Sequence, residues 1–217
     1  MSKIDLKEVT KLLSYMATFD GCLFPTKRDG YKNRNAQLII NMREENSDYL
    51  DWVSSVLLSV NIGVRVACRK DYNTDGYVRK PQLRLESRRH PKLTTLRDRL
   101  YLPDGKKVLD PHMLKLLDAE ALAIIFMTDG GAGLNTTTPR LKNPSPCVSL
   151  NTKGFSHFDN LALSKVIYEK FGVRSSINRH NQYFYIRIKT QDVKMFIEII
   201  EPHILPSFNY KLERLAP

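Results

Sequence analysis

Apolar positions in the first half of the chain alternate between helical and strand periods. Leu6 to Phe19 carries apolar residues every three or four positions, which predicts a helix. The same reading gives two strands, a helix for which Ser47 is a candidate cap, two further strands and a last helix that starts at a proline. The expected strands are Cys22–Lys27, Ala36–Met42, Val64–Arg69 and Gln82–Ser87, and the last helix is Pro91–Leu100.

The second half repeats this order of elements. Helices are expected from Pro111 to Thr128, from Phe158 to Phe171 and from Asp192 to Ile200. The strands expected between them are Gly133–Thr138, Cys147–Asn151, Val173–Arg179 and Tyr183–Lys189. Each half therefore reads helix, two strands, helix, two strands, helix.

Short sequence matches support a duplication. Asp20-Gly21 and Asp129-Gly130 both end an apolar helix and lie 109 positions apart. Gly63-Val64-Arg65 and Gly172-Val173-Arg174 have the same offset, whereas Pro103 and Pro206 are offset by 103. A fixed offset is typical of internal repeats. We therefore predict an α+β fold of two pseudo-symmetric αββαββα repeats, 1–107 and 108–217.

The two repeated aspartates are the main candidates for chemistry. An Asp-Gly pair after a single helix is most simply a turn, because both residues are common there. Here each aspartate ends an apolar helix, where the helix dipole disfavours an anion. A divalent cation would offset that charge, and two carboxylates brought together can hold Mg²⁺ for phosphodiester displacement. Asp20 and Asp129 are therefore predicted to be catalytic metal ligands.

These segments resemble the LAGLIDADG motif of homing endonucleases, and Leu122–Gly131, "LAIIFMTDGG", is the clearer copy. The second half is similar to the branch that contains the yeast mitochondrial large-rRNA intron endonuclease. That similarity runs through "SLNTKGF", "EKFGVRSSI", "YFYIRI" and "IEPHILPSFNYKL". The resemblance implies a saddle of two antiparallel sheets backed by helices. It also implies Mg²⁺ or Mn²⁺ at Asp20 and Asp129, and cleavage of both DNA strands with 3′ overhangs.

Two lysines follow from the same resemblance. Lys107 ends "PDGKK" and Lys211 ends "PSFNYK", each a few residues after a proline of the repeat. The implied role is to polarise the attacking water or to stabilise charge in the transition state. The first motif departs from the family at Tyr15 and Phe19, where small residues are usual at the helix interface.

The charge balance favours a polyanionic partner. The chain has 34 Lys and Arg against 23 Asp and Glu, a formal net charge of +11. Alternation along the strands gives one apolar face and one face rich in Arg, Gln and Tyr, which suits readout in the major groove. The residues predicted to contact DNA are Lys27, Arg28, Lys32, Arg34, Arg65, Arg69, Lys70, Arg79, Lys80, Arg84, Arg140, Lys142, Arg174, Arg179, Tyr183, Arg187 and Lys189.

We therefore expect a monomeric, site-specific endonuclease for a long asymmetric duplex target. Its own intron RNA is a possible second partner, and an intron RNA maturase or a non-cleaving DNA-binding protein is the alternative. Membrane insertion is not expected, because there is no 18-residue apolar run. The three separated cysteines and the absence of a secretion signal favour a cytoplasmic or organellar location. His180-Asn181 lacks the partners of a zinc nuclease site.

Overall fold

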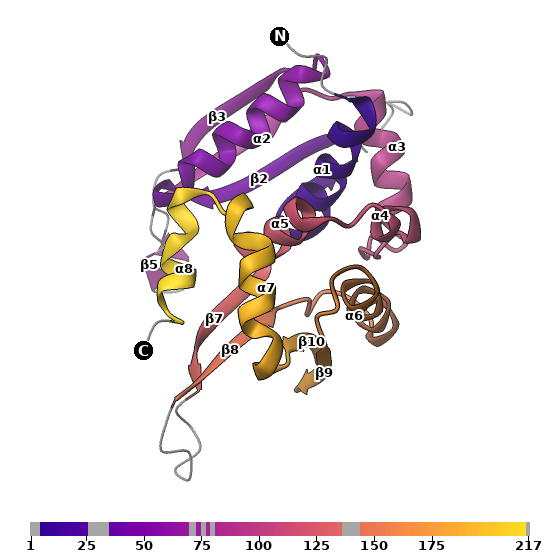
Figure 1. Ribbon diagram of the computed structural model, residues 1–217. Coiled ribbons are helices and arrows are strands. Elements are labelled where there is room, and N and C mark those ends of the chain that lie inside the picture. Colours follow the sequence, from indigo (N-terminus) through magenta and orange to yellow (C-terminus); the bar gives the residue numbers. More distant parts are fainter. Residues whose placement is uncertain are drawn as a thin grey trace. The chain divides into compact units, whose positions relative to one another are not determined.

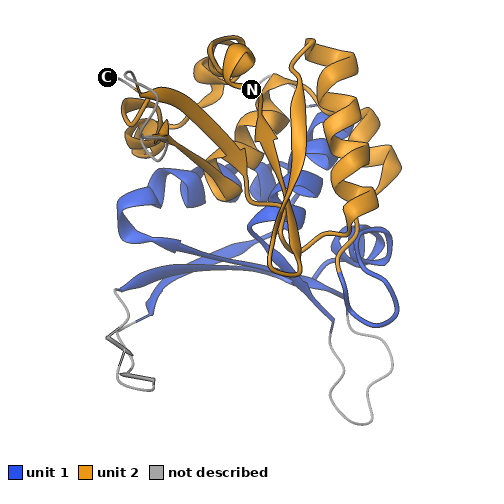
Figure 2. Cartoon of the chain, turned by 90° about the horizontal axis from the view of Figure 1, so that it is seen from below, with its two compact units in different colours: residues 1–106 blue, residues 107–217 orange. Residues whose placement is uncertain are grey.

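The computed structural model describes residues 5–25, 35–69, 73–74, 77–78, 81–135 and 144–215. The chain forms two compact units, residues 1–106 and 107–217, shown in two colours in Figure 2. This division lies one residue from the repeat boundary expected from the sequence. Among the described residues, no helix has the length and apolar character needed to cross a membrane.

Unit 1 contains three long helices and a four-stranded sheet. The first helix is stabilised at its start by Asp5, whose side chain accepts a hydrogen bond from the Lys7 N–H. The elements are α1 (Leu6–Phe19), β1 (Cys22–Phe24), β2 (Gln37–Arg43), η1 (Glu44–Asn46), α2 (Ser47–Ser59), β3 (Val64–Arg69), β4 (Asn73–Thr74), β5 (Tyr77–Val78), β6 (Gln82–Ser87) and α3 (Pro91–Leu100).

The sheet of unit 1 is antiparallel and has the order β1-β2-β6-β3. Its apolar face includes Leu38, Ile40 and Leu85, all of them fully buried. Helix α2 lies across this sheet and packs on β2, β3 and β6 (Figure 1). The core of unit 1 therefore lies between one face of the sheet and the helices, and the opposite face carries the polar residues.

Unit 2 repeats this plan with added elements. Its elements are α4 (Pro111–Lys115), α5 (Ala119–Asp129), β7 (Gly130–Asn135), β8 (Ser145–Leu150), α6 (His157–Phe171), β9 (Ser175–His180), β10 (Tyr183–Ile188), η2 (Thr190–Asp192), α7 (Val193–Ile200), η3 (Glu201–His203), η4 (Pro206–Phe208) and α8 (Asn209–Glu213). The sheet order is β7-β8-β10-β9, again antiparallel. In chain order both sheets run first, second, fourth, third, which confirms the predicted α+β duplication.

Several boundaries differ from the sequence prediction. The helix expected from Pro111 to Thr128 is two helices, because the chain breaks after Leu116 and Asp118 caps a new helix through the Ala121 N–H. Ser47 is the first residue of α2 and not its cap, which is Asn46. The β4–β5 hairpin and the short helix α8 were not expected, since neither has a long periodic pattern.

The Gly-Val-Arg match is wrong as a structural correspondence. Val64 pairs with Ser87 in unit 1, and the equivalent pair in unit 2 is Ser175 with Ile188. The residue that ends the second long helix in the left-handed conformation is Asn61 in unit 1 and Gly172 in unit 2. The structural offset at this point is therefore two residues larger than the sequence match implies.

Candidate catalytic and nucleic-acid-binding site

Asp129 is the last residue of a helix that is buried on every side. The side chains from Ala121 to Met127 are all buried, and the ring of Phe126 packs edge-on against Phe196 of α7. The next residue, Gly130, donates its N–H to the Phe126 carbonyl and already belongs to β7. A Cβ at Gly130 would lie 2.3 Å from that carbonyl oxygen, so only glycine permits this direct helix-to-strand turn.

Lys211 holds the end of this helix. It comes from α8, and its side chain is buried. The ammonium donates hydrogen bonds to the carbonyl oxygens of Phe126, Met127 and Gly130 at 3.1, 2.6 and 2.8 Å. These carbonyls form the negative end of the helix dipole, where a cation is favourable. Lys211 therefore fixes the backbone on both sides of Asp129.

The carboxylate of Asp129 lies in a partly buried, electrostatically tuned place. Within the described residues it makes no hydrogen bond or salt bridge. Burial raises the pKa of Asp129 to about 6, while the positive charges of Lys107 and Lys211 act in the opposite direction. Two lysines predicted from sequence are thus close enough to Asp129 to act on its charge. The group resists ionisation until a further cation approaches it.

Asp20 occupies the equivalent position at the end of α1. It is the C-cap residue, half-buried, and both its N–H and the N–H of Gly21 point to the Met16 carbonyl. The sheet register supports the equivalence, because Cys22 pairs with Ile39 as Gly131 pairs with Ser149. The spacing from each aspartate to its paired strand residue is therefore the same in both units.

The polar faces of the two sheets follow from the register. The face of unit 1 that points away from its apolar side carries Cys22, Phe24, Gln37, Ile39, Asn41, Arg43, Arg65, Ala67, Arg69, Gln82, Arg84 and Glu86. The corresponding face of unit 2 carries Gly131, Gly133, Asn135, Ser145, Cys147, Ser149, Ser176, Asn178, His180, Tyr183, Tyr185 and Arg187. We call these sets the polar face of unit 1 and the polar face of unit 2.

Most described residues predicted to contact DNA lie on these faces, but three do not. Arg174 forms a bidentate ion pair with Asp192, Nε–Oδ2 and Nη2–Oδ1 both at 2.7 Å, which holds the pKa of that carboxyl down to about 2. Arg179 pairs with Phe184, so it belongs to the opposite side of the sheet, and Lys189 follows the end of β10. The predicted contacts that lie outside the described residues are Lys27, Arg28, Lys32, Arg34, Lys70, Arg79, Lys80, Arg140 and Lys142.

Sequence reasoning did not single out Glu86, which lies in the middle of the polar face of unit 1. Its Oε1 lies 2.6 Å from Arg84 Nε, and its backbone partner across the neighbouring strand is Arg65. The signal that would have found it is alternation, because Glu86 is two residues from Arg84 on one strand. Only the register shows that Arg65 lies opposite.

The donor set around Asp129 suits a hard cation without forming a complete cage. In the part of the chain that the structure describes, no three His, Cys, Asp or Glu side chains come together as a metal site. A carboxylate that burial keeps from ionising is nevertheless a suitable oxygen ligand, since Mg²⁺ is often held by one or two carboxylates with water and substrate phosphates. The residues fit such an ion.

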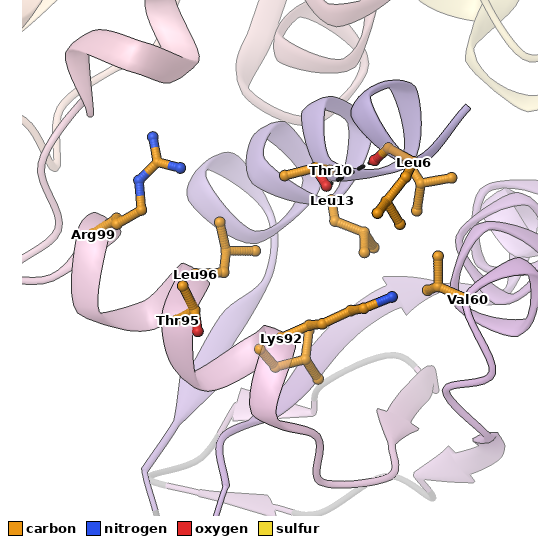
Figure 3. Close-up of a pocket in the computed structure, with 10 residues that line it drawn as sticks. Leu6, Thr10, Leu13, Val60, Lys92, Thr95, Leu96 and Arg99 are labelled. Carbon is orange, nitrogen blue, oxygen red and sulfur yellow. Dashed lines mark hydrogen bonds between the residues drawn. The ribbon is translucent and has the colours of Figure 1, made fainter. Parts of the chain in front are cut away.

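The apolar cavity of unit 1 is a different feature. It has a volume of about 250 Å³ and is lined by α1, the end of α2 and α3, with Leu6, Leu13 and Leu96 among its walls (Figure 3). Lys92 and Arg99 are its charged lining residues, and no carboxylate reaches it. It therefore has no part in the chemistry that Asp20 and Asp129 suggest.

Comparisons with known proteins agree with this geometry. The chain is 30% identical over 109 residues to a probable intron-encoded DNA endonuclease of Mycosarcoma maydis, a match that covers 50% of this chain and 74% of the relative. It spans less than two thirds of several other curated relatives. One is a cytochrome b mRNA maturase of Saccharomyces cerevisiae, 30% identical over 112 residues, which cover 49% of this chain and 23% of the maturase.

Solved structures show the same fold. The homing endonuclease I-WcaI bound to its DNA recognition sequence matches with a TM-score of 0.72 and 21% identity, over 94% of this chain and 85% of that one. The homing endonuclease I-DmoI in complex with DNA and Ca matches with a TM-score of 0.55 and 14% identity, over 94% and 96%. A sequence model described as the LAGLIDADG DNA endonuclease family matches residues 20–196. This chain belongs to the LAGLIDADG DNA endonuclease family.

Proposed function

We propose that this protein is a site-specific endonuclease that hydrolyses both strands of a long, asymmetric duplex DNA target with a divalent metal ion. The observation that carries the proposal is Asp129, a carboxylate at the negative end of a buried helix, whose burial raises its pKa to about 6. A structural turn has no need for an acid in that position. Asp20 repeats the arrangement on α1.

The residues have distinct parts in this proposal. Asp129 and Asp20 hold Mg²⁺ or Mn²⁺, and the bound ion supplies charge neutralisation at the scissile phosphate and lowers the pKa of water. Lys211 positions Asp129, because its ammonium is engaged by three carbonyls of the helix end and the following strand. Lys107, half-buried and acting on the charge of Asp129, is assigned the role of polarising the attacking water.

DNA binding in this proposal rests on charge and on the two polar faces. The net charge of +11 supplies affinity for phosphates, and the exposed Arg65 and Arg69 with Tyr183 supply contacts to base edges. Relatives of the same fold were solved with a DNA target, and I-DmoI was solved with DNA and Mg, Mn or Ca. Because both repeats lie in one chain, we propose that the enzyme acts as a monomer.

Two steps test the proposal. Duplexes that bind the protein are first selected from a randomised library in Ca²⁺, and the selected site is cloned into a supercoiled plasmid. Mg²⁺ or Mn²⁺ is then added, and linear DNA with 3′ overhangs is expected. Asp129→Asn and Asp20→Asn should each slow linearisation by at least about a hundredfold while binding persists, because neutral amides no longer hold the cation.

Asp51→Asn is the matched control, since Asp51 is an exposed acid on α2. It should cleave like the wild type. If the selected site is bound tightly but no metal ion produces linear DNA, the nuclease proposal fails and DNA binding alone remains. Cleavage that is equally fast in both Asn variants would also overturn it, because the activity would then come from elsewhere.

A maturase role is the second candidate. The match to the Saccharomyces cerevisiae maturase favours it, although that match covers 23% of the relative. The role requires specific binding of the chain's own intron RNA, if its gene lies in an intron. Competition between the selected DNA and that RNA separates the roles, since RNA that binds only through charge is displaced by salt.

A further inference from the structure

The polar faces of the two units differ in charge although their strands have the same order. The described part of the unit 1 face carries four arginines and one glutamate, whereas that of unit 2 carries Arg187 as its one arginine. Register gives the equivalent positions. Arg84 corresponds to Tyr185, and Arg65 corresponds to Ser176. The two halves therefore offer different chemistry to whatever binds them.

A hollow of about 370 Å³ lies in the middle of the unit 1 face. Its lining consists of Arg65, Ala67, Arg69, Arg84 and Glu86. Ala67 faces Arg84 across the β3–β6 ladder, and its methyl group leaves room between the two flanking arginines of β3. The hollow is therefore open above an alanine and walled by guanidinium groups.

Arg84 is held in place by Glu86. Their Nε–Oε1 distance is 2.6 Å, and the Arg84 side chain is only 25% exposed. Because the carboxylate approaches Nε, the two terminal Nη groups of Arg84 are left to form a fork toward the hollow. The fork matches the O6 and N7 acceptors of guanine, which is the commonest specific contact of arginine in the major groove.

The equivalent residues of unit 2 are engaged with one another. Ser176 donates to the Asn178 side chain at 3.1 Å, and the Asn178 amide donates to the Tyr185 hydroxyl at 3.4 Å. These groups carry no charge. They can donate to or accept from any base, but they do not offer a bidentate fork for guanine.

We infer that unit 1 selects a guanine in its half of the DNA target through Arg84, with Glu86 as the positioning residue and Arg65 as a second contact beside it. Unit 2 reads its half through uncharged groups and Arg187. The inference rests on the proposed DNA-binding function, but it does not require cleavage. The target is therefore asymmetric in chemistry, with its strongest guanine requirement under unit 1.

The test measures binding in Ca²⁺, so it is independent of strand cleavage. Selection from randomised duplexes should return a site with an invariant guanine in one half. Arg84→Gln should reduce the preference for guanine over adenine at one position by about tenfold or more, because a glutamine pairs better with adenine. Glu86→Gln should weaken the same preference and tighten binding to unrelated duplex, since it removes a negative charge.

Arg99→Gln is the matched control, because Arg99 is an exposed arginine on α3 and not on the sheet. It should leave base preference unchanged. If Arg84→Gln weakens binding to all sequences equally and lowers the salt slope by about one, Arg84 contacts phosphate and the inference is overturned. Loss of cytosine preference in Glu86→Gln with guanine selection intact would overturn it too, because Glu86 would then read a base itself.

Discussion

The two units end their first long helix at an equivalent aspartate but treat the helix end differently. In unit 2 the Lys211 ammonium binds the last carbonyls of α5, whereas in unit 1 the N–H groups of Asp20 and Gly21 both approach the Met16 carbonyl. Among the described residues, unit 1 has no helix after α3, so α8 has no counterpart there. Duplication kept the backbone path and the acid, and the supporting charge diverged.

The same contrast holds on the polar faces. Unit 1 concentrates arginines around Ala67, and unit 2 presents serine, asparagine and tyrosine at the same ladder positions. A single chain can diverge in this way because each half is free to contact different DNA. A symmetric dimer of one repeat would be restricted to a near-palindromic target. The asymmetry of the faces is therefore consistent with the asymmetric target that we propose.

The largest stability effect is expected at Lys211. Lys211→Met keeps most of the stem but removes the donor for three carbonyls, so we expect the free energy of unfolding to fall by about 3 kcal/mol. Urea denaturation followed by circular dichroism measures this. Lys165→Met on the exposed face of α6 is the control and should change it by less than about 0.5 kcal/mol. Equal effects of the two variants would show that Lys211 does not support the helix end.

The next effect depends on pH and has the opposite sign. Because the pKa of Asp129 is about 6 in the folded state and 3.8 in the reference state, its ionisation costs stability as pH rises through 6. Asp129→Asn removes that cost, so at pH 7.5 the variant should be more stable than the wild type by up to about 2 kcal/mol. The gain should shrink between pH 7 and pH 5.

Thermal melts in metal-free buffer across that pH range measure the difference. Asp51→Asn, an exposed acid on α2, is the control and should show no such trend. A constant difference between Asp129→Asn and the wild type at every pH would mean that Asp129 is ionised throughout. The combination of higher stability with lost cleavage is what distinguishes a catalytic acid from a structural one.

Periodicity alone was sufficient for most of the fold. It placed α1, β3, β6 and α3 at the residues that the structure gives, because amphipathic patterns with long periods depend on local sequence only. It failed at Asp118, where a capping side chain divides one apolar stretch into two helices. The charge partners of the site lay further beyond reach, since Lys211 meets the end of α5 more than eighty residues away along the chain.

Repeat matching by letters also has a physical limit. Asp20 and Asp129 are correctly matched, because the strand registers beside them agree. The Gly-Val-Arg match fails because two different residues, Asn61 and Gly172, satisfy the same left-handed position. Both residue types tolerate that conformation, so the backbone requirement survives while the letters drift.

The smallest effects test this correspondence. Gly172 has φ 70° and open space around a Cβ, so Gly172→Ala should cost about 1 kcal/mol from conformation alone. Asn61 has φ 62°, so Asn61→Ala should cost a similar amount, while Asn61→Gly should be nearly neutral. Chemical denaturation of the three variants measures these differences.

Gly63→Ala is the discriminating comparison. The letter match pairs Gly63 with Gly172, but Gly63 does not have a positive φ, and an added Cβ would meet only the flexible Arg88 side chain at 3.1 Å. Its cost should therefore stay below about 0.5 kcal/mol. If Gly63→Ala costs as much as Gly172→Ala while Asn61→Ala costs nothing, the letter match is right and the register-based correspondence is wrong. The structure requires the reverse, because strain follows the backbone conformation and not the residue name.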